Sequence, residues 1–173
     1  MPMDDRAPPP LTPAPLAPLS LRIIELLVSR GVAHQVLRHA PALTSEEVSR
    51  VRGTPLEAGA KALVCHADDR LVLIVVPADT RLDSRAFKQL AGVKNVRMID
   101  ADRVYDLVGA PVGAVPPFGS LFGLPTYADV DVAERDQIAF NIGGRDVSVT
   151  MRGRDYAALE QPTLGRFARR APS

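Results

Sequence analysis

Two apolar segments joined by a short charged turn constrain the fold of this chain more than any other feature. Residues 61–67 and 71–76 are rich in leucine, valine and isoleucine, and the sequence Ala67-Asp68-Asp69-Arg70 between them is typical of a turn. Short, uninterrupted apolar runs indicate strands that are buried on both faces. We therefore predict an antiparallel hairpin with both strands largely buried.

The rest of the chain intersperses short helices and strands without a strict βαβ order. Apolar periodicity and capping residues predict helices over residues 19–30, 44–53, 83–90, 102–108 and 154–159. Strand patterns cover residues 34–38, 95–99, 126–132, 137–142 and 146–151, the last two forming a hairpin. This order predicts an α+β (mixed α/β) fold, with a central, largely antiparallel, barrel-like sheet flanked by helices.

Charge and composition exclude several classes of protein. A net charge of +1 argues against a strongly basic nucleic-acid coat, so any RNA contact must come from a local patch. Tryptophan is absent and aromatic residues make up 5%, which argues against a base-stacking platform. One cysteine and three scattered histidines offer no metal-ligand spacing, so we expect neither a metal nor a cofactor. The lone Cys65 is typical of a reducing compartment, and we expect a cytoplasmic protein.

Lys61 is an unusual residue in this sequence. The chain has 18 arginines but only three lysines, so it uses arginine for generic positive charge. A lysine at the start of a buried strand is therefore a candidate for binding an anion or a carbonyl oxygen. The alternative is a lysine at a strand end that extends its ammonium group to solvent.

A loop rich in glycine and proline is the second candidate element. It has the sequence Val112-Gly113-Ala114-Val115-Pro116-Pro117-Phe118-Gly119. Glycine lets a ligand approach the main chain closely, and consecutive prolines hold the chain rigid. Such a loop could present backbone N–H groups in a fixed array, although an ordinary surface connection would also contain these residues.

These two elements, with a third, resemble the YbaK/ProRS-associated (INS-like) family of aminoacyl-tRNA editing domains. The segment Gly59–Val64 (Gly-Ala-Lys-Ala-Leu-Val) is similar to the strand entry that carries the family's lysine. The segment Gly113–Pro117 fits its G-x-x-x-P loop, and Phe140–Gly144 is similar to a third, weaker motif. The similarity runs from about residue 19 to about residue 159, in the family's order and spacing.

The resemblance implies a free-standing trans-editing deacylase that cleaves the 3′-terminal ester of mischarged tRNA. It assigns catalysis to Lys61 and Gly113, with positioned water, backbone donors and help from a ribose hydroxyl of the substrate. It assigns substrate binding to the rest of the loop and to the third motif: Ala114, Val115, Pro116, Pro117, Phe118, Gly119, Asn141, Gly143 and Gly144. The implied partners are the acceptor end of mischarged tRNA and, as a further candidate, an aminoacyl-tRNA synthetase.

Several alternatives stay open at this point. A non-catalytic module with the same fold could bind aminoacyl-tRNA or a synthetase, and the same pocket chemistry could hydrolyse another small ester or amide. Asp129 matches an acidic position common in the family, although an aspartate at a strand end is usually solvated. No histidine follows His66, which leaves open the amino acid that the pocket accepts.

Both ends of the chain are predicted to lie outside the domain at residues 19–160. Residues 1–18 are rich in proline and are expected to form a disordered tail, with a ligand for a proline-binding domain as the alternative. Residues 161–173 are expected to form a basic, solvated tail, with contact to acceptor-stem phosphates as the alternative. No segment has the roughly 18–20 consecutive apolar residues that a membrane span requires, so no membrane association is expected.

Overall fold

The predicted hairpin lies at the centre of the molecule in the computed structural model, which describes residues 14–170. Strands β2 (Ala60–Ala67) and β3 (Arg70–Pro77) pair in antiparallel register, with Lys61 opposite Val76. The side chains of residues 73–76 on β3 are fully buried. The hairpin is confirmed, and its continuous apolar sequence reflects burial on both faces.

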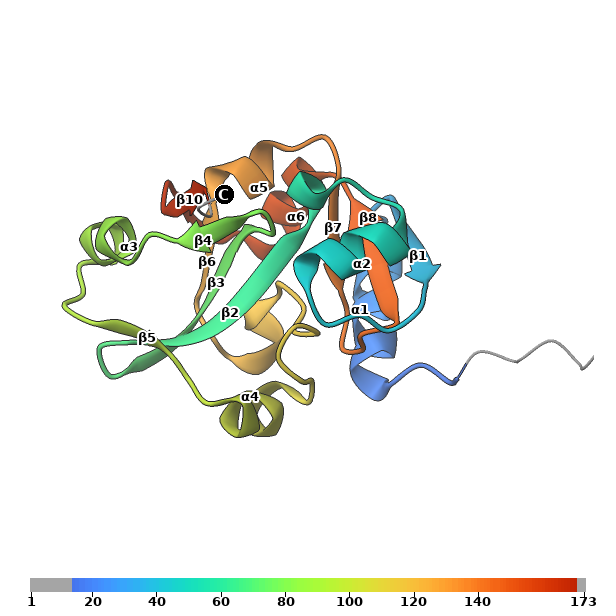
Figure 1. Ribbon diagram of the computed structural model, residues 1–173, viewed down its shortest axis with the longest axis horizontal. Coiled ribbons are helices and arrows are strands. Elements are labelled where there is room, and N and C mark those ends of the chain that lie inside the picture. The colour runs from blue at the N-terminus through green and yellow to red at the C-terminus, as the bar shows by residue number, and fades with distance from the viewer. Residues whose placement is uncertain (1–13, 171–173) are drawn as a thin grey trace, which may run out of the picture.

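Three further strands extend this hairpin into a five-stranded sheet of order β5-β2-β3-β6-β9 (Figure 1). Strand β5 (Val96–Met98) pairs antiparallel with β2, whereas β6 (Thr126–Asp129) and β9 (Thr163–Gly165) add in parallel. The sheet is therefore mixed, and the predicted α+β (mixed α/β) class is confirmed.

A second, three-stranded antiparallel sheet has the order β1-β8-β7. It contains β1 (His34–Arg38), β7 (Ile138–Asn141) and β8 (Val147–Met151), and the last two form the hairpin predicted around residues 143–144. A single parallel bridge between Gly59 and Ala139 joins it to the residue just before β2. This bridge brings the start of β2 beside β7, which is where the candidate site lies.

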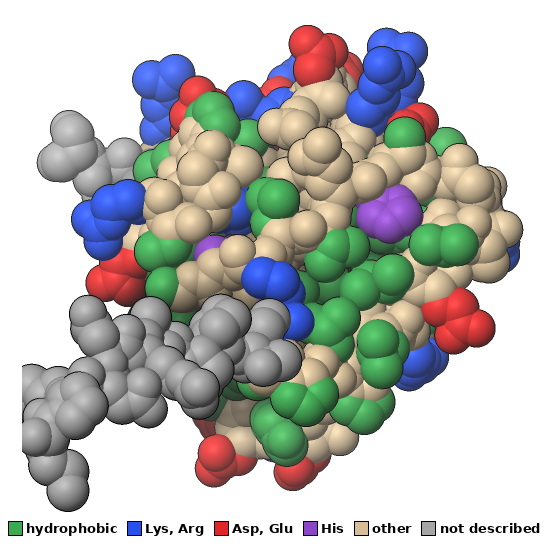
Figure 2. All heavy atoms as spheres, turned by 90° about the vertical axis from the view of Figure 1, so that its right-hand side faces the viewer, with side chains coloured by type: hydrophobic (Ala, Val, Ile, Leu, Met, Phe, Trp, Pro, Cys, Tyr) green, Lys and Arg blue, Asp and Glu red, His purple; other side chains and the backbone are tan. Residues whose placement is uncertain are grey.

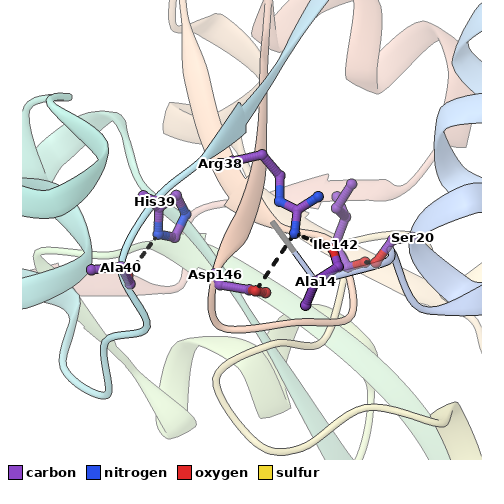
Figure 3. A network of polar contacts seen from close by, with 7 residues as sticks. All are labelled: Ala14, Ser20, Arg38, His39, Ala40, Ile142 and Asp146. Atoms are coloured by element: carbon purple, nitrogen blue, oxygen red, sulfur yellow. Dashed lines mark hydrogen bonds and ion pairs between the residues drawn. The ribbon is translucent and has the colours of Figure 1, made fainter. Parts of the chain in front are cut away.

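Helix α1 (Pro18–Ser29) is attached to the second sheet by polar contacts (Figure 3). The hydroxyl of Ser20 donates to the carbonyl oxygen of Ile142 at 2.6 Å, beside the turn between β7 and β8. Arg38 on β1 donates to the carbonyl oxygen of Ala14 and lies 3.8 Å from a carboxylate oxygen of Asp146. The N-terminal segment is thereby fixed against the sheet from residue 14 onward.

The face formed by α1 and β1 has an apolar centre (Figure 2). Leu21 and Val28 on α1 and Val36 on β1 expose 53%, 63% and 37% of their surface. Among residues 14–170, no helix is both long and apolar enough to cross a membrane.

Four other helices lie close to their predicted ranges: α2 (Ser45–Arg52), α3 (Ser84–Ala91), α4 (Ala101–Val108) and α6 (Gly153–Glu160). The short helix α5 (Val130–Glu134) and the 3₁₀ turns η1 (Leu56–Ala58) and η2 (Gly119–Phe122) were not predicted. Thr44 and Asp83 cap α2 and α3 by accepting from the amides of Glu47 and Ala86, as the capping residues predict. The strand predicted over 126–132 ends instead at Asp129, because this residue caps α5 through the amide of Asp131.

The C-terminal segment corrects the expectation of a solvated tail. Besides β9, residues 161–170 form β10 (Ala168–Arg170), which pairs antiparallel with β4 (Thr80–Leu82). Phe167 is only 1% exposed and lies edge-on to Phe87, with ring centres 5.5 Å apart. The basic residues around Phe167 led to the prediction of a solvated tail, although this side chain packs in the core. At the other end, residues 1–13 of the predicted tail lie outside the described residues, whereas Leu16 packs against the core and Pro18 begins α1.

Candidate active site

A cavity of about 190 Å³ lies where α2, the start of β2, the glycine- and proline-rich loop and β7 meet. Lys61, Gly113 and Asn141, taken from the three motifs of the sequence, all line it. These residues are far apart in the chain, and the bridge between Gly59 and Ala139 brings two of the segments together. The structure thus assembles the three motifs around one cavity.

Lys61 is half-buried and is the second residue of strand β2. Its ammonium group donates to the carbonyl oxygen of Thr80, which follows β3. Burial lowers the pKa of Lys61; Glu46 and Asp79 oppose this shift, and the positive charge of Arg81 adds to it. An ammonium group has three hydrogens to donate, so one bond to Thr80 leaves donors for a ligand in the cavity.

Gly113 lies at the third position of a β-turn in the loop. The amide of Ala114 donates to the carbonyl oxygen of Pro111 at 2.9 Å, and Gly113 has a φ of +88°. This left-handed conformation is the one that a type II turn requires at this position, which explains the glycine. Within the described chain, the amides of Gly113 and Val115 have no hydrogen-bond partner, and both residues line the cavity. They are therefore candidate donors to a ligand.

Asn141 fixes this turn from β7. Its side-chain Nδ2 donates to the carbonyl oxygen of Gly113 at 2.7 Å. Its Oδ1 accepts from Ser148 Oγ at 2.9 Å and from Arg52 Nη2 at 3.3 Å. Ser148 in turn lies 2.7 Å from Nε2 of His39. Asn141 is 7% exposed, so this network holds the turn in a single orientation.

Arg52 is a cavity residue that the sequence did not reveal. It lies at the C-terminal end of α2, lines the cavity and contacts Asn141. Burial lowers its pKa to about 10, and its Nε is buried with no partner among the described residues. A basic residue in the last turn of a helix is usually exposed to solvent, where it interacts favourably with the helix dipole. The sequence around Arg52 therefore gives no signal that this residue lines a cavity.

Most of the remaining predicted substrate-binding residues do not line the cavity. Ala114, Pro116, Pro117, Phe118 and Gly119 are buried parts of the loop that face away from the cavity lining, and Gly143 and Gly144 form the turn between β7 and β8. Of the predicted loop donors after Gly113, only Val115 lines the cavity.

Packing contacts explain where these residues lie. The ring of Phe118 lies edge-on to Phe140 and Tyr156, with ring centres 5.6 and 5.5 Å away, and Tyr156 donates to the carbonyl oxygen of Pro117 at 2.7 Å. Gly119 must be glycine, because a Cβ there would lie 2.3 Å from the hydroxyl of Thr126. The loop is therefore rigid because its second half belongs to the core.

Two other residues that the sequence singled out lie outside the cavity. Asp129 is 2% exposed and accepts backbone amides of Asp131, Phe167 and Ala168, so its role is structural. Burial raises the pKa of the Cys65 thiol to about 12, which makes it a poor nucleophile.

The cavity suits electrostatic catalysis better than acid–base or metal catalysis by side chains. Among the described residues that line it, none is an aspartate, a glutamate or a histidine. Across residues 14–170, no group of three such side chains or cysteines could hold a metal ion. What the cavity offers is two cations and a fixed main-chain turn, the elements that stabilise negative charge on a carbonyl oxygen.

Comparison with known proteins identifies the family of the chain. The model of the aminoacyl-tRNA editing domain family matches residues 39–159, a range that contains every residue of the cavity named above. The chain belongs to this family. The family predicted from the three motifs is therefore confirmed.

Individual editing-domain proteins are similar over most of the chain. The multifunctional Ser/Thr-tRNA deacylase ProXp-y of Escherichia coli K12 is 37% identical over 155 residues, which cover 87% of this chain and 93% of that protein. A proline–tRNA ligase of Syntrophomonas wolfei is 30% identical over 122 residues, or 68% of this chain and 21% of the ligase. The crystal structure of a candidate trans-editing enzyme for prolyl-tRNA synthetase superposes with a TM-score of 0.78, at 24% identity, over 90% of this chain and 99% of that one. At this identity the structural match concerns the fold.

Proposed function

We propose that this protein is a trans-editing hydrolase that removes the amino acid from mischarged tRNA by cleaving the 3′-terminal ester. The observation that carries the proposal is the meeting of Lys61 with the turn at Gly113 in one cavity, where Asn141 fixes the turn. Membership of the editing family and the extent of the match to the E. coli deacylase support the same activity.

The reaction needs little from the protein besides orientation and positive charge. Water attacks the ester carbonyl carbon, and the carbonyl oxygen takes the electron pair and becomes an oxyanion. The ammonium group of Lys61 and the amide of Val115 stabilise this oxyanion by donating hydrogen bonds. The intermediate then re-forms the carbonyl and expels the ribose oxygen, which takes the proton that the attacking water gives up, and free amino acid and uncharged tRNA result. Because no described cavity residue is a conventional base, a neighbouring ribose hydroxyl of the substrate orients the water.

The cavity favours a small amino acid. Its volume of about 190 Å³ is modest. The hydroxyl of Thr44, which lines the cavity, accepts a hydrogen bond from the amide of Glu47 and keeps its own proton to donate to the bound amino acid. The name of the E. coli relative includes serine and threonine, so these two residues are the first candidates for this chain. The cytoplasmic location and binding to an aminoacyl-tRNA synthetase stay predictions.

A deacylation screen with a panel of mischarged tRNAs, seryl- and threonyl-tRNA first, tests this function. We expect Lys61→Ala to lower kcat/KM by about 30- to 1,000-fold, equivalent to about 2–4 kcal/mol of transition-state stabilisation. Lys94→Ala is the matched control, because Lys94 is exposed and does not line the cavity. Near-normal turnover by Lys61→Ala would remove this lysine from the mechanism. Tight binding of a charged tRNA by the wild type without hydrolysis would favour the non-catalytic module.

A further inference from the structure

Two arginines face each other across the short sheet formed by β4 and β10. The antiparallel register places Arg169 directly opposite Arg81, and both side chains are exposed. Side chains that are directly opposite lie on the same face of the sheet with Cβ atoms about 5 Å apart, where like charges destabilise the pair. The fold thus holds two positive charges together at an energetic cost.

Among the described residues, neither of these arginines forms an ion pair with a carboxylate. Asp79 and Asp83 flank β4 in the sequence, but Asp83 caps α3. In the described part of the chain, no carboxylate oxygen lies within 4.0 Å of a guanidinium nitrogen of Arg81 or Arg169. Arg166 differs from them, because it lies 3.6 Å from the carboxylate of Asp131. The paired arginines are therefore available to an external anion.

The position of the pair is fixed by the core beneath it. Oδ2 of Asp129 accepts the amides of Phe167 and Ala168, both at 2.8 Å, immediately before Arg169. The ring of Phe167 is buried against Phe87. Strand β10 is therefore a rigid platform rather than a flexible basic tail that could move its charge away from Arg81.

The paired arginines lie next to the candidate active site. Thr80, the residue before Arg81, accepts the hydrogen bond of the ammonium group of Lys61, which lines the cavity. Burial lowers the pKa of Lys61, and the charge of Arg81 lowers it further, so the two cations lie within electrostatic range. Arg169 lies on β10, the strand that pairs with β4 (Figure 1). Positive charge thus continues from the cavity onto the surface.

We propose that Arg81 and Arg169 bind phosphates of the tRNA acceptor end as it leaves the cavity. The inference rests on the proposed deacylase function, since an ester bound beside Lys61 is attached to a polyanion that must run across the neighbouring surface. Guanidinium groups bind phosphate oxygens in bidentate fashion, and an anion between them removes their mutual repulsion. The net charge of +1 gives the molecule little long-range attraction for RNA, so a local pair of this kind supplies the contact.

Kinetics with two substrates test the proposal. One is full-length mischarged tRNA, and the other is the same amino acid esterified to adenosine, which carries no phosphate. We expect Arg81→Gln and Arg169→Gln each to raise KM for the tRNA by roughly tenfold with little change in kcat, and to leave cleavage of the aminoacyl-adenosine unchanged. Each variant should also reduce the slope of log(kcat/KM) against log[salt] by about 0.7–0.9. Arg22→Gln is the matched control, because Arg22 is an exposed arginine on α1.

The double variant of Arg81 and Arg169 separates phosphate binding from a structural role. Wild-type kinetics and salt slope in the double variant would overturn the proposal, and so would an equal loss with both substrates. A melting temperature that is unchanged or higher in the double variant supports it, because a repulsive pair has been removed; a clear loss of stability would assign the pair a structural role instead. If the wild type cleaves neither substrate, the deacylase function fails. Fluorescence anisotropy with uncharged tRNA then tests phosphate binding by the two arginines. Binding by the wild type that the double variant loses supports the proposal, and equal binding by both proteins, or none, overturns it.

Discussion

Replacing Gly113 by valine separates the role of the loop in catalysis from its role in folding. Gly113 has a φ of +88°, and a Cβ added there would meet no heavy atom within 4 Å. The cost of valine to folding therefore comes from the left-handed backbone alone, about 1–3 kcal/mol. For a chain of this size, that corresponds to a loss of about 2–12 °C in melting temperature.

Gly92→Val is a matched control for this strain. Gly92 ends α3 with a φ of +67°, has equally open space around its Cβ and lies outside the cavity. We expect both variants to lose similar stability, but only Gly113→Val to lose turnover. If the strained turn displaces the amide of Val115, one oxyanion donor is lost, and the rate falls by about 10²–10³-fold.

Deacylation assays below both melting temperatures, on every tRNA that the wild type accepts, measure this difference. The loss should be similar for each amino acid, because the main chain contacts the ester that all of them share. Equal activity of Gly113→Val and Gly92→Val would show that the loop is only a connection. A loss for one amino acid alone would place Gly113 against the side chain of the substrate rather than its ester.

Three other residues give predictions that probe the site and its surroundings. Arg52→Met should leave the free energy of unfolding nearly unchanged, because it removes a desolvated charge, yet lower kcat/KM; denaturation and turnover measured together check this, and a large loss of stability would make Arg52 structural. Cys65→Ser should stay active within a few-fold, since burial raises the thiol pKa to about 12, and inactivity of the folded variant would indicate thiol catalysis. Burial raises the pKa of Glu160 and outweighs the hydrogen bonds to Ser120 and Thr126, which lower it. The folded state therefore binds the proton of Glu160 more tightly than the unfolded state, and stability falls as pH rises from about 4.3, the unfolded pKa, through the raised pKa of the folded state. Glu160→Gln should lack this fall, and parallel melting-temperature profiles of the two proteins between pH 4 and 8 would contradict the assignment.

The elements predicted correctly from the sequence are those whose signals are local. The β2–β3 hairpin follows from two apolar runs and a turn, and α2 follows from Thr44 with Glu47 three residues later. The pairing of β10 with β4 joins residues that are far apart in the sequence, and nothing within Ala168–Arg170 indicates a strand. The environment that buries Phe167 comes entirely from other parts of the chain.

The candidate site shows the same division. The residue types at Lys61 and Gly113 were informative because a rare lysine and a glycine beside prolines are unusual locally. The hydrogen bond from Asn141 to Gly113, however, joins residues 28 positions apart, and the third motif indicated Asn141 as a substrate-binding residue rather than as the residue that fixes the loop. Arg52 has the sequence context of a solvated residue at a helix end, and its place in the cavity follows only from the fold. Proximity in space, rather than residue type, was the missing information.

The contacts of Asp129 also determine how far the chain can be shortened. The match to the family ends at residue 159, and a truncation there would remove both amides that donate to Oδ2 of Asp129. Oδ2 of this buried carboxylate would then lack both of its partners, although Oδ1 would keep the amide of Asp131, and the ring of Phe87 would lose the contact with Phe167. A shortened protein that ends at the family boundary would therefore be unstable even though it keeps every cavity residue. The unit that folds extends past the last residue that sequence comparison assigns to the family.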